Sequence, residues 1–323
     1  MQNTDTMAQT ELDHGIALFT QGRKTEGLTI IQRLAVGGLA RAIYTLGIMR
    51  WGGDIEQDPV DARRLFELAS LRGDADAHVF ATNLLANGVA GRRDWQAALA
   101  RLRLEATKIA PRRKALDLIG SMKLDAEGNP VGQAIAEQAS SAPFVQVFRK
   151  LFTREECDYV SALASSSFQP SMVYNRQREL VRDPIRSSDG SVLHWLLEDP
   201  AIHALNRRIA ALAGLPPENG EAAQVLRYRD GQQYRPHYDF VQASPNQRVT
   251  TVLVWLNDAY EGGETAFLKT GLQLKGRVGD AVLFRNALPD RSLDTLTEHA
   301  GLPVTRGTKL LYNRWIRENR WAP

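Results

Sequence analysis

Apolar residues recur at three- and four-residue spacing over roughly the first 110 positions, which is the periodicity of amphipathic α-helices. The pattern also repeats, because residues 39–74 resemble residues 75–110 at a shift of 36. Each unit predicts a helix, a glycine-containing turn and a second helix. A repeat in the mid-thirties built in this way predicts a helical solenoid. The aligned pairs are Tyr44 with Phe80, Gly52 with Gly88, Asp58 with Asp94, and Ala62 with Ala98.

The pattern changes beyond residue 122. Residues 123–143 are rich in small and polar side chains and contain two prolines, as expected of a connector. The following stretch, 143–152, alternates like a strand, and 153–166 has the pattern of an amphipathic helix. A second helix is predicted over 191–214, interrupted by Pro200. From Ala222 onward, short β-type runs are separated by turn clusters.

These patterns predict an α+β protein of two domains. We expect an all-α solenoid of helical repeats over residues 1–122 and a linker over 123–143. Residues 144–323 are expected to form a double-sheet β-barrel, or jelly roll, with supporting helices. Evenly spaced short strands after a few helices are typical of that architecture.

Composition narrows the function only slightly. The chain has 323 residues, of which 43% are hydrophobic and 24% are charged, with a formal charge of +3. This balance gives no reason to expect a nucleic acid or an anionic membrane as partner. The single cysteine, Cys157, excludes an internal disulfide and is expected in a helical core position. Neither a secretory signal nor an apolar run of about 18 residues is present, so a cytoplasmic protein is expected.

The candidate chemistry lies in the second half, where His237 and Asp239 stand two positions apart. On a strand, residues i and i+2 point to the same face, so both side chains can reach one metal ion. Imidazole with carboxylate suits Fe(II), Mn or Zn, but a third ligand is needed. His194 and His203 lie in a helical pattern and are expected to pack or cap. His299, several strands further on, would complete a facial triad of two histidines and one carboxylate.

A lysine follows the third candidate ligand by ten residues. If residues 308–315 form a strand, Lys309 shares one face with Leu311, Asn313 and Trp315. A lysine that points into a barrel is costly unless it meets an anion. A dicarboxylate whose other end chelates the metal would satisfy it.

Five ordered stretches of the carboxy-terminal 180 residues resemble the prolyl 4-hydroxylase-type 2-oxoglutarate and Fe(II)-dependent dioxygenases. The opening VFRKLFTREECDYV resembles the start of the same domains, and the amino-terminal units resemble Sel-like repeats, which are relatives of tetratricopeptide repeats. The five stretches are QVLRYRDGQQYRPHYD (224–239), RVTTVLVWLND (248–258), EGGETAF (261–267), GDAVLF (279–284) and HAGLPVTRGTKLLYNRWI (299–316).

The resemblance implies roles for named residues. His237, Asp239 and His299 would hold Fe(II), while Lys309 would pair with the distal carboxylate of 2-oxoglutarate. Tyr228 would bond the same co-substrate. O2 is the second co-substrate, with ascorbate as the expected reductant. The residues matching those near a peptide substrate are Tyr234, Arg248 and Trp315, together with Arg186 and Ser188 from IRSSDGS (185–191), which resembles a flexible segment of the family.

One residue departs from the family pattern. Arg317 stands where some peptide prolyl hydroxylases have a histidine near the substrate, which leaves the substrate open. The expected reaction is hydroxylation of proline at its 4-position in a peptide or protein, with release of succinate and CO2. The helical repeats are candidates for holding that peptide, since such arrays often present grooves. Two alternatives stay open: hydroxylation of another side chain or of a small molecule, and a repeat-based interaction protein with an inactive oxygenase domain.

Overall fold

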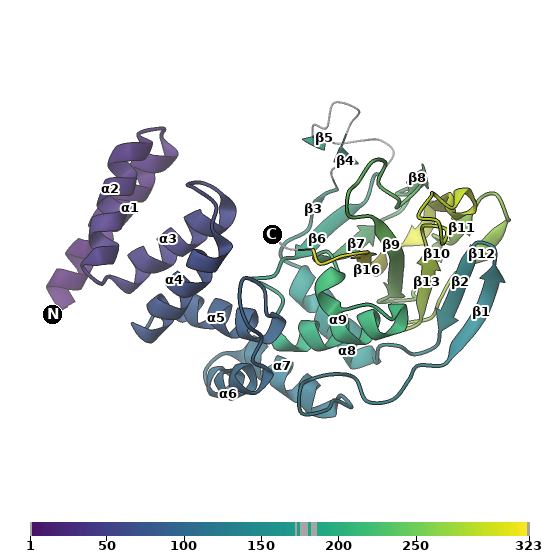
Figure 1. The fold of residues 1–323 in the computed structure, drawn as a ribbon, viewed down its shortest axis with the longest axis horizontal. Coiled ribbons are helices and arrows are strands. Elements are labelled where there is room, and N and C mark those ends of the chain that lie inside the picture. Colours follow the sequence, from purple (N-terminus) through teal and green to yellow (C-terminus); the bar gives the residue numbers. More distant parts are fainter. Residues whose placement is uncertain (1, 172, 175–179, 182–185, 322–323) are drawn as a thin grey trace. The chain divides into compact units, whose positions relative to one another are not determined.

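The computed structural model describes residues 2–171, 173–174, 180–181 and 186–321 (Figure 1). Residue Ile185 of the predicted substrate segment lies outside these ranges. The chain divides into two compact units. The first comprises Met1–Arg113 together with Trp195–Pro200, and the second comprises Lys114–His194 and Ala201–Ala322. The domain boundaries expected at residues 122 and 143 stay predictions.

Helices at the predicted spacing build the first unit. Within the described ranges none of the chain's helices is long and apolar enough to cross a bilayer. A further helix, α7, begins at the end of this unit. The helices are α1 (Gln2–Thr20), α2 (Lys24–Val36), α3 (Ala40–Gly52), α4 (Pro59–Leu71), α5 (Ala75–Asn87), α6 (Trp95–Glu105) and α7 (Ala110–Ser121).

Matching caps mark the repeat. Asp58 and Asp94 each cap a helix by accepting a hydrogen bond from the backbone N–H three residues later. Gly53 and Gly88 each end the preceding helix in the left-handed conformation, with φ of 79° and 72°. The glycine equivalent to Gly88 is therefore Gly53, not the Gly52 expected from the sequence, because the second connecting loop is one residue longer.

The prediction of one helix over 191–214 is wrong in its first part. Asp189–Leu193 is strand β6, and helix α9 spans Pro200–Ala213. Pro200 begins the helix instead of interrupting it, because proline is well tolerated in a first turn. Residues Trp195–Pro200 belong to the first unit. There Leu196 packs in a core with Trp51, Phe66 and Leu84.

Two antiparallel sheets form the second unit, as expected for a jelly roll. The smaller sheet has the order β12 (Leu272–Leu274), β11 (Thr265–Phe267), β14 (His299–Gly301) and β8 (Tyr234–His237). Strand β1 falls within the predicted connector. The larger sheet has the order β1 (Ala136–Ser141), β2 (Phe144–Phe148), β13 (Ala281–Arg285), β9 (Arg248–Trp255), β16 (Lys309–Arg317), β7 (Ala223–Tyr228), β6 and β3 (Gln169–Pro170).

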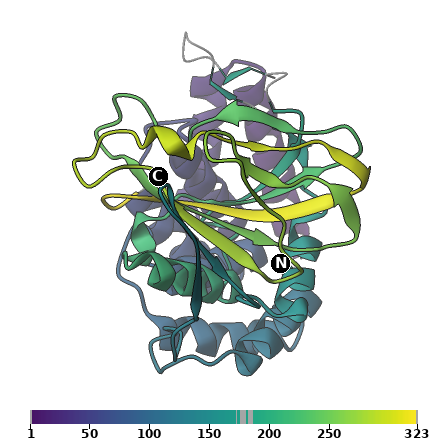
Figure 2. The same ribbon diagram turned by 90° about the vertical axis from the view of Figure 1, so that its right-hand side faces the viewer.

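Short ladders complete the unit at its edges. Strand β10 (Tyr260–Gly262) pairs with β15 (Val304–Gly307). Strand β4 (Val173–Tyr174) pairs with β5 (Leu180–Val181). In Figure 2 the yellow β16 crosses the middle of the larger sheet.

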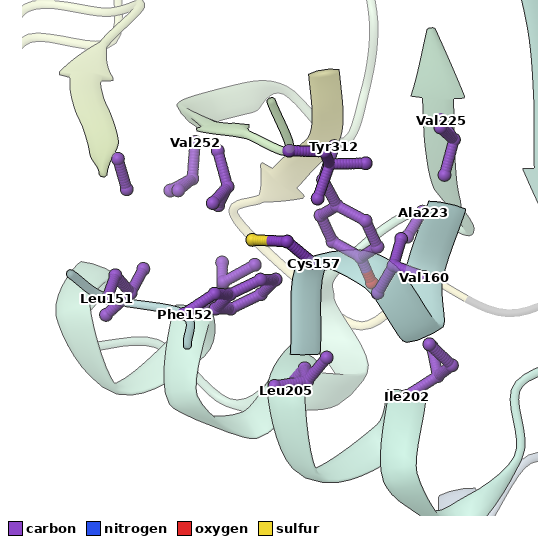
Figure 3. Close-up of a cluster of buried hydrophobic side chains, with 14 of the residues drawn as sticks. Leu151, Phe152, Cys157, Val160, Ile202, Leu205, Ala223, Val225, Val252 and Tyr312 are labelled. Atoms are coloured by element: carbon purple, nitrogen blue, oxygen red, sulfur yellow. The ribbon is translucent and has the colours of Figure 1, made fainter. Parts of the chain in front are cut away.

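Helices α8 (Arg154–Ala164) and α9 cover one face of the larger sheet. Helix α8 begins with a capping box of Thr153 and Glu156, which fixes its first turn. Its Cys157 is buried in the core beneath the sheet, as predicted, beside Tyr312 (Figure 3). Tyr312 and Ile316 of β16 belong to this core, so the alternate residues of that strand face the other way.

A second core fills the space between the two sheets. Phe267 of the smaller sheet contacts Phe284 of the larger one edge to face, with 5.2 Å between ring centroids. Leu311 of β16 lies in the same cluster. The two sheets are thereby held face to face, and the residues of β16 that alternate with Tyr312 point between them.

Candidate metal centre and active site

Three side chains in the second unit can converge on one ion. His237 ends β8, His299 begins β14, and the two are paired across the ladder. The sequence suggested that Asp239 lies on the strand, but it lies in a bend that begins two residues after His237. One ligand atom from each of the three lies within 4.8 Å of the others, the only such cluster of at least three histidine, cysteine or acidic residues in the described part of the chain.

The distances suit a divalent transition metal. The Nε2 atom of His237 lies 3.8 Å from one Asp239 oxygen, and the Nε2 atom of His299 lies 3.7 Å from the other. Two donors bound to one ion at about 2.1 Å cannot be more than about 4.2 Å apart. Both separations fall inside that limit.

Backbone carbonyls orient both imidazoles. His237 donates from Nδ1 to the carbonyl oxygen of Arg235 at 2.8 Å, and His299 donates from Nδ1 to that of Thr297 at 2.9 Å. A carbonyl only accepts, so in the neutral form of each ring Nδ1 carries the proton and Nε2 keeps its lone pair. Both lone pairs are therefore available to a metal.

The protonation states agree with this role. Burial, reinforced by His299, lowers the pKa of His237 to about 3. That imidazole is therefore neutral at physiological pH. Burial alone would raise the pKa of Asp239, but the two imidazoles and Arg248 outweigh it and hold the carboxyl below its usual range. The site thus combines two imidazole nitrogen donors with one anionic oxygen donor.

Two polar residues that no sequence motif singles out support the carboxylate. Thr251 donates its hydroxyl to Asp239 at 2.7 Å, and the Asn286 amide donates to Thr251 at 2.9 Å. Thr251 and Asn286 are fully buried. Thr251 lies on β9 and Asn286 directly follows β13, so both are separated from Asp239 along the chain, and the pairing of these strands brings the two residues together. Such outer contacts fix a ligand's orientation and basicity.

Lys309 lies in the same pocket as the three candidate ligands. Leu311, Asn313 and Trp315 line it too, which confirms the predicted shared face of β16. The lysine is 2% exposed and donates to the carbonyl oxygen of Gly263 at 2.6 Å. Burial lowers the pKa of Lys309 to about 7, with Glu264 acting in the opposite direction. A buried ammonium with a carbonyl as its partner is suited to receive an anion.

Tyr228, Arg186 and Ser188 lie together at another wall. Tyr228 and Arg186 line the pocket, and Tyr228 faces Lys309 in the β7–β16 ladder. Burial raises the pKa of the Tyr228 phenol, while Arg186 and a hydrogen bond with Ser188 act in the opposite direction. Ser188 is buried and shares a hydrogen bond of 3.0 Å with Ser171. The segment expected to be flexible thus contains the start of strand β6 and a bridge from Arg186 to Tyr234.

A bulge brings Tyr234 onto the ring of His237. The two residues are three positions apart, so regular alternation would place them on opposite faces. The β8–β14 ladder instead shifts register between them, and their rings stack with centroids 3.4 Å apart and an interplanar angle of 14°. Tyr234 therefore supports a candidate ligand from below its ring and also lines the pocket.

Arg248 stacks on Trp315. The guanidinium carbon of Arg248 lies 3.7 Å from the Trp315 ring centroid. Trp315 lines the pocket, whereas Arg317 is held by Glu221 and stacks on Trp321. No pattern in the sequence singles out Glu221. This glutamate lies just before strand β7 and is not part of a recognisable sequence motif.

Three polar atoms around the pocket lack protein partners among the described residues. They are the Nε of Arg186, the Oδ1 of Asn313 and the indole Nε1 of Trp315, and all three are buried. Buried polar groups are normally hydrogen-bonded, and exceptions call for an explanation. Their gathering at one pocket, beside a metal-type cluster and a buried lysine, indicates a binding site for a polar ligand.

The comparisons with known proteins agree with this geometry. The 2OG-Fe(II) oxygenase superfamily model matches residues 223–317. Prolyl 4-hydroxylase 5 of Arabidopsis thaliana is 35% identical over 217 residues, which cover 59% of this chain and 74% of that protein. Probable prolyl 4-hydroxylase 3 of the same plant is 34% identical over 210 residues, covering 57% and 73%.

Two solved structures are also similar to parts of the chain. The viral collagen prolyl hydroxylase of Paramecium Bursaria Chlorella virus-1, in its 2OG complex, has 28% identity and a TM-score of 0.42 and covers 54% of this chain and 95% of that one. A Sel1 repeat protein from Oxalobacter formigenes has 21% identity and a TM-score of 0.31, covering 38% and 51%.

The two plant prolyl 4-hydroxylases are more than 30% identical to this chain over about three quarters of their own length. The superfamily match contains all three residues of the metal-type cluster and Lys309. The chain is therefore an oxygenase and belongs to the prolyl 4-hydroxylase family of the 2OG-Fe(II) oxygenase superfamily.

Proposed function

We propose that the chain uses Fe(II), 2-oxoglutarate and O2 to hydroxylate C4 of proline in a peptide or protein, releasing succinate and CO2. The observation that carries the proposal is one pocket that joins the His237, Asp239 and His299 cluster to the buried Lys309. Family membership supports the reaction type, and the relatives named as prolyl 4-hydroxylases support proline as the target.

In this proposal His237, Asp239 and His299 hold the iron. Their donor set fits Fe(II), because two imidazoles and one carboxylate on one side leave three positions for other ligands. When bound, the iron supplies the oxygen chemistry that breaks an unactivated C–H bond. The carbonyls at Arg235 and Thr297 keep the Nε2 lone pairs directed at the ion.

Lys309 and Tyr228 bind 2-oxoglutarate in the proposal. The ammonium group of Lys309 pairs with the distal carboxylate, which compensates the cost of burying the charge. Tyr228 is its neighbour in the ladder and lies with its ring centroid 5.4 Å from Nζ, so its hydroxyl can donate to the same end of the molecule. Tyr234, Arg248, Trp315, Arg186 and Ser188 are assigned to the substrate side.

The test is mass spectrometry of proline-containing peptides incubated with the purified chain, iron, 2-oxoglutarate and ascorbate, the proposed reductant. The expected product is a peptide with one added oxygen on proline, at C4 by comparison with authentic 4-hydroxyproline. Succinate release that no proline peptide stimulates would contradict proline as the substrate. The alternative, another side chain or a small molecule, would then be supported.

Binding of the peptide by the helical repeats is a further part of the proposal. Helical arrays commonly hold extended chains. On α5, the amides of Asn83 and Asn87 already donate to the carbonyls of Leu196 and Trp195, at 2.7 and 2.9 Å. A peptide would therefore have to use other positions of the repeats. We also propose a cytoplasmic location, which cell fractionation would test.

The affinity for 2-oxoglutarate should fall as pH rises above neutrality. In the free site the pKa of Lys309 is about 7, so the ammonium that binds the carboxylate is present below this pH and is lost above it. Bound carboxylate favours the charged form, so the pKa rises on binding. We expect the KM for 2-oxoglutarate to be lowest below pH 7 and to rise by up to about tenfold per pH unit above it.

The measurement is the KM for 2-oxoglutarate between about pH 6 and pH 9, compared with that of Lys309→Arg. A guanidinium stays charged over this range. The variant should therefore show a flatter profile, whatever its absolute KM. Equal slopes in both proteins would contradict the assignment of the pH dependence to Lys309.

A further inference from the structure

Positive charge gathers around α6, in the last part of the helical repeats. Residues 88–113 contain seven lysines and arginines against two acidic residues. Asp94 caps α6 with its carboxylate. Glu105 is buried and accepts hydrogen bonds from Arg112 and Thr82. Both acidic side chains are thus already engaged, so the exposed cations of this stretch find no neutralising carboxylate within it.

Three exposed cations lie around the carboxyl end of α6, and we call them the basic cluster. They are Arg103 in the last turn of the helix, Lys108 in the turn that follows, and Arg113. Arg113 donates from Nε to the carbonyl oxygen of Ala106, the C-cap of α6, at 2.9 Å, so its side chain lies against the helix end. None of the three cations has a carboxylate within ion-pair distance among the described residues.

The earlier arginines of the repeats differ from the basic cluster, because each arginine before residue 65 lies within ion-pair distance of a carboxylate. The pairs are Arg23 with Glu26, Arg33 with Glu11, Arg41 with Asp74, Arg50 with Asp61, Arg63 with Glu67, and Arg64 with Asp61. The carboxyl end of a helix carries about half a negative charge, which attracts cations but cannot neutralise three. A net positive charge therefore remains at the end of α6.

The rest of this surface suits a polypeptide better than a nucleic acid. Leu104, next to Arg103 in the sequence, is 67% exposed and offers an apolar contact. Trp95 is the one aromatic residue of 88–113, and it is only 5% exposed. Surfaces that bind single-stranded nucleic acid combine cations with exposed rings on which the bases stack. An acidic peptide needs no such ring, and its carboxylates pair with guanidinium and ammonium groups.

We propose that the basic cluster binds an acidic segment of the polypeptide substrate. Its three cations pair with aspartate or glutamate side chains, while Leu104 contacts an apolar side chain among them. This inference rests on the proposed function and deepens it, because it gives the charge of the substrate and the residues of the repeats that hold it. Since the repeats and the oxygenase unit share one chain, binding at the cluster raises the effective concentration of the target proline.

The first test is the affinity of the full chain for an acidic peptide without proline. Fluorescence anisotropy gives the Kd of a labelled glutamate-rich peptide and of its glutamine-rich counterpart. We expect the glutamate peptide to bind at least about tenfold more tightly, and to bind less tightly as salt is added, because salt screens exposed charges. Equal Kd values for the two peptides overturn the proposal. Tighter binding of a single-stranded RNA of the same charge also overturns it.

A triple variant tests the cluster itself. The changes Arg103→Gln, Lys108→Gln and Arg113→Gln together should raise the Kd of the glutamate peptide at least about tenfold. The matched control removes three exposed arginines that are paired, by Arg23→Gln, Arg33→Gln and Arg64→Gln. The control changes the net charge equally and should alter the Kd less than about twofold. Equal losses in both variants would mean that only the overall charge matters, which contradicts the proposal.

A single charge reversal covers the case in which the triple variant does not fold. Lys108 is exposed in a turn, so its replacement removes no packing from the core. Lys108→Glu should raise the Kd of the glutamate peptide at least about threefold. An unchanged Kd in this variant counts against the cluster.

The second test links the cluster to turnover. The KM of a proline peptide is measured with a flexible glutamate-rich tail and with a glutamine-rich tail. We expect the KM with the glutamate tail to be at least about fivefold lower in the wild type and equal for the two tails in the triple variant. Equal KM values in the wild type overturn the proposal. If no peptide is hydroxylated, the proposed reaction is contradicted, while the anisotropy experiment still decides whether the cluster binds acidic segments.

Discussion

Replacing His299 by alanine is expected to abolish iron binding and to lower proline hydroxylation by at least about a thousandfold. The side chain is 4% exposed, and its Nε2 atom lies 3.7 Å from an oxygen of Asp239. Alanine removes one of three converging donors and leaves a cavity between Phe267 and Phe284, which both contact the imidazole. Iron content per chain and hydroxyproline yield are the measurements.

His14→Ala provides the control, because that histidine is exposed on α1 and far in sequence from the cluster. It should retain full iron content and turnover. Added imidazole is expected to restore part of the iron binding of His299→Ala, since a free ring can occupy the cavity. Wild-type iron content in His299→Ala, with an intact fold, would contradict the assignment of this residue.

The alternation along β16 was sufficient to predict one side of the pocket. Because strand residues alternate between faces, Lys309 and Trp315 had to share a face once the strand was recognised. The structure confirms this, and places Tyr312 and Ile316 in the core on the other face. The regular alternation of a long strand with one apolar face depends only on residues near one another in the sequence, so it can be predicted from the sequence.

The register shifts in β8 and β9 could not be predicted from the alternation of residues along a strand. The register shift in β8 places Tyr234 on the ring of His237, and the shift in β9 turns Arg248 toward Arg317. A bulge changes the face of the sheet on which a side chain lies, and no residue type in these two stretches indicates a bulge. The family resemblance, not the alternation, was the reason to expect Tyr234 and Arg248 near the substrate.

Hydrogen bonds that join residues far apart in the sequence could not be predicted from the sequence either. Thr251 is 12 residues from Asp239, and Glu221 is 27 and 96 residues from its two arginines. Threonine in a strand and glutamate before one are ordinary residues by composition. Their roles arise from strand order, because β9 and β16 are neighbours and each brings a guanidinium to the same carboxylate.

The buried lysine shows how the fold favours function over stability. Its ammonium group contacts the Gly263 carbonyl and the Tyr228 ring and has no carboxylate within ion-pair distance among the described residues. A buried ammonium without an anion destabilises the folded state, as its depressed pKa indicates. Apolar residues pack elsewhere between the sheets, so an apolar residue at this position would suit the core better unless an anion binds there.

Lys309→Met is therefore expected to raise the KM for 2-oxoglutarate by about 100-fold or more. Methionine has a similar length and removes only the charge and its donors. Loss of one partner from a buried hydrogen-bonded charge pair costs about 2–5 kcal/mol, and about 2.7 kcal/mol corresponds to 100-fold. The same change should stabilise the free protein against thermal unfolding, since the cost of burying the ammonium disappears. Steady-state kinetics and thermal unfolding measure the two effects.

Lys275→Met is the matched control for Lys309→Met. Lys275 donates to the carbonyl of Tyr260 at 3.0 Å and lies close enough to Lys309 to influence its pKa, but it does not line the pocket. Its replacement should change the KM for 2-oxoglutarate less than about threefold. If Lys309→Met binds 2-oxoglutarate as well as the wild type does, the co-substrate carboxylate is held elsewhere. A simultaneous rise in KM and in unfolding temperature would instead establish that one buried charge trades stability for co-substrate affinity.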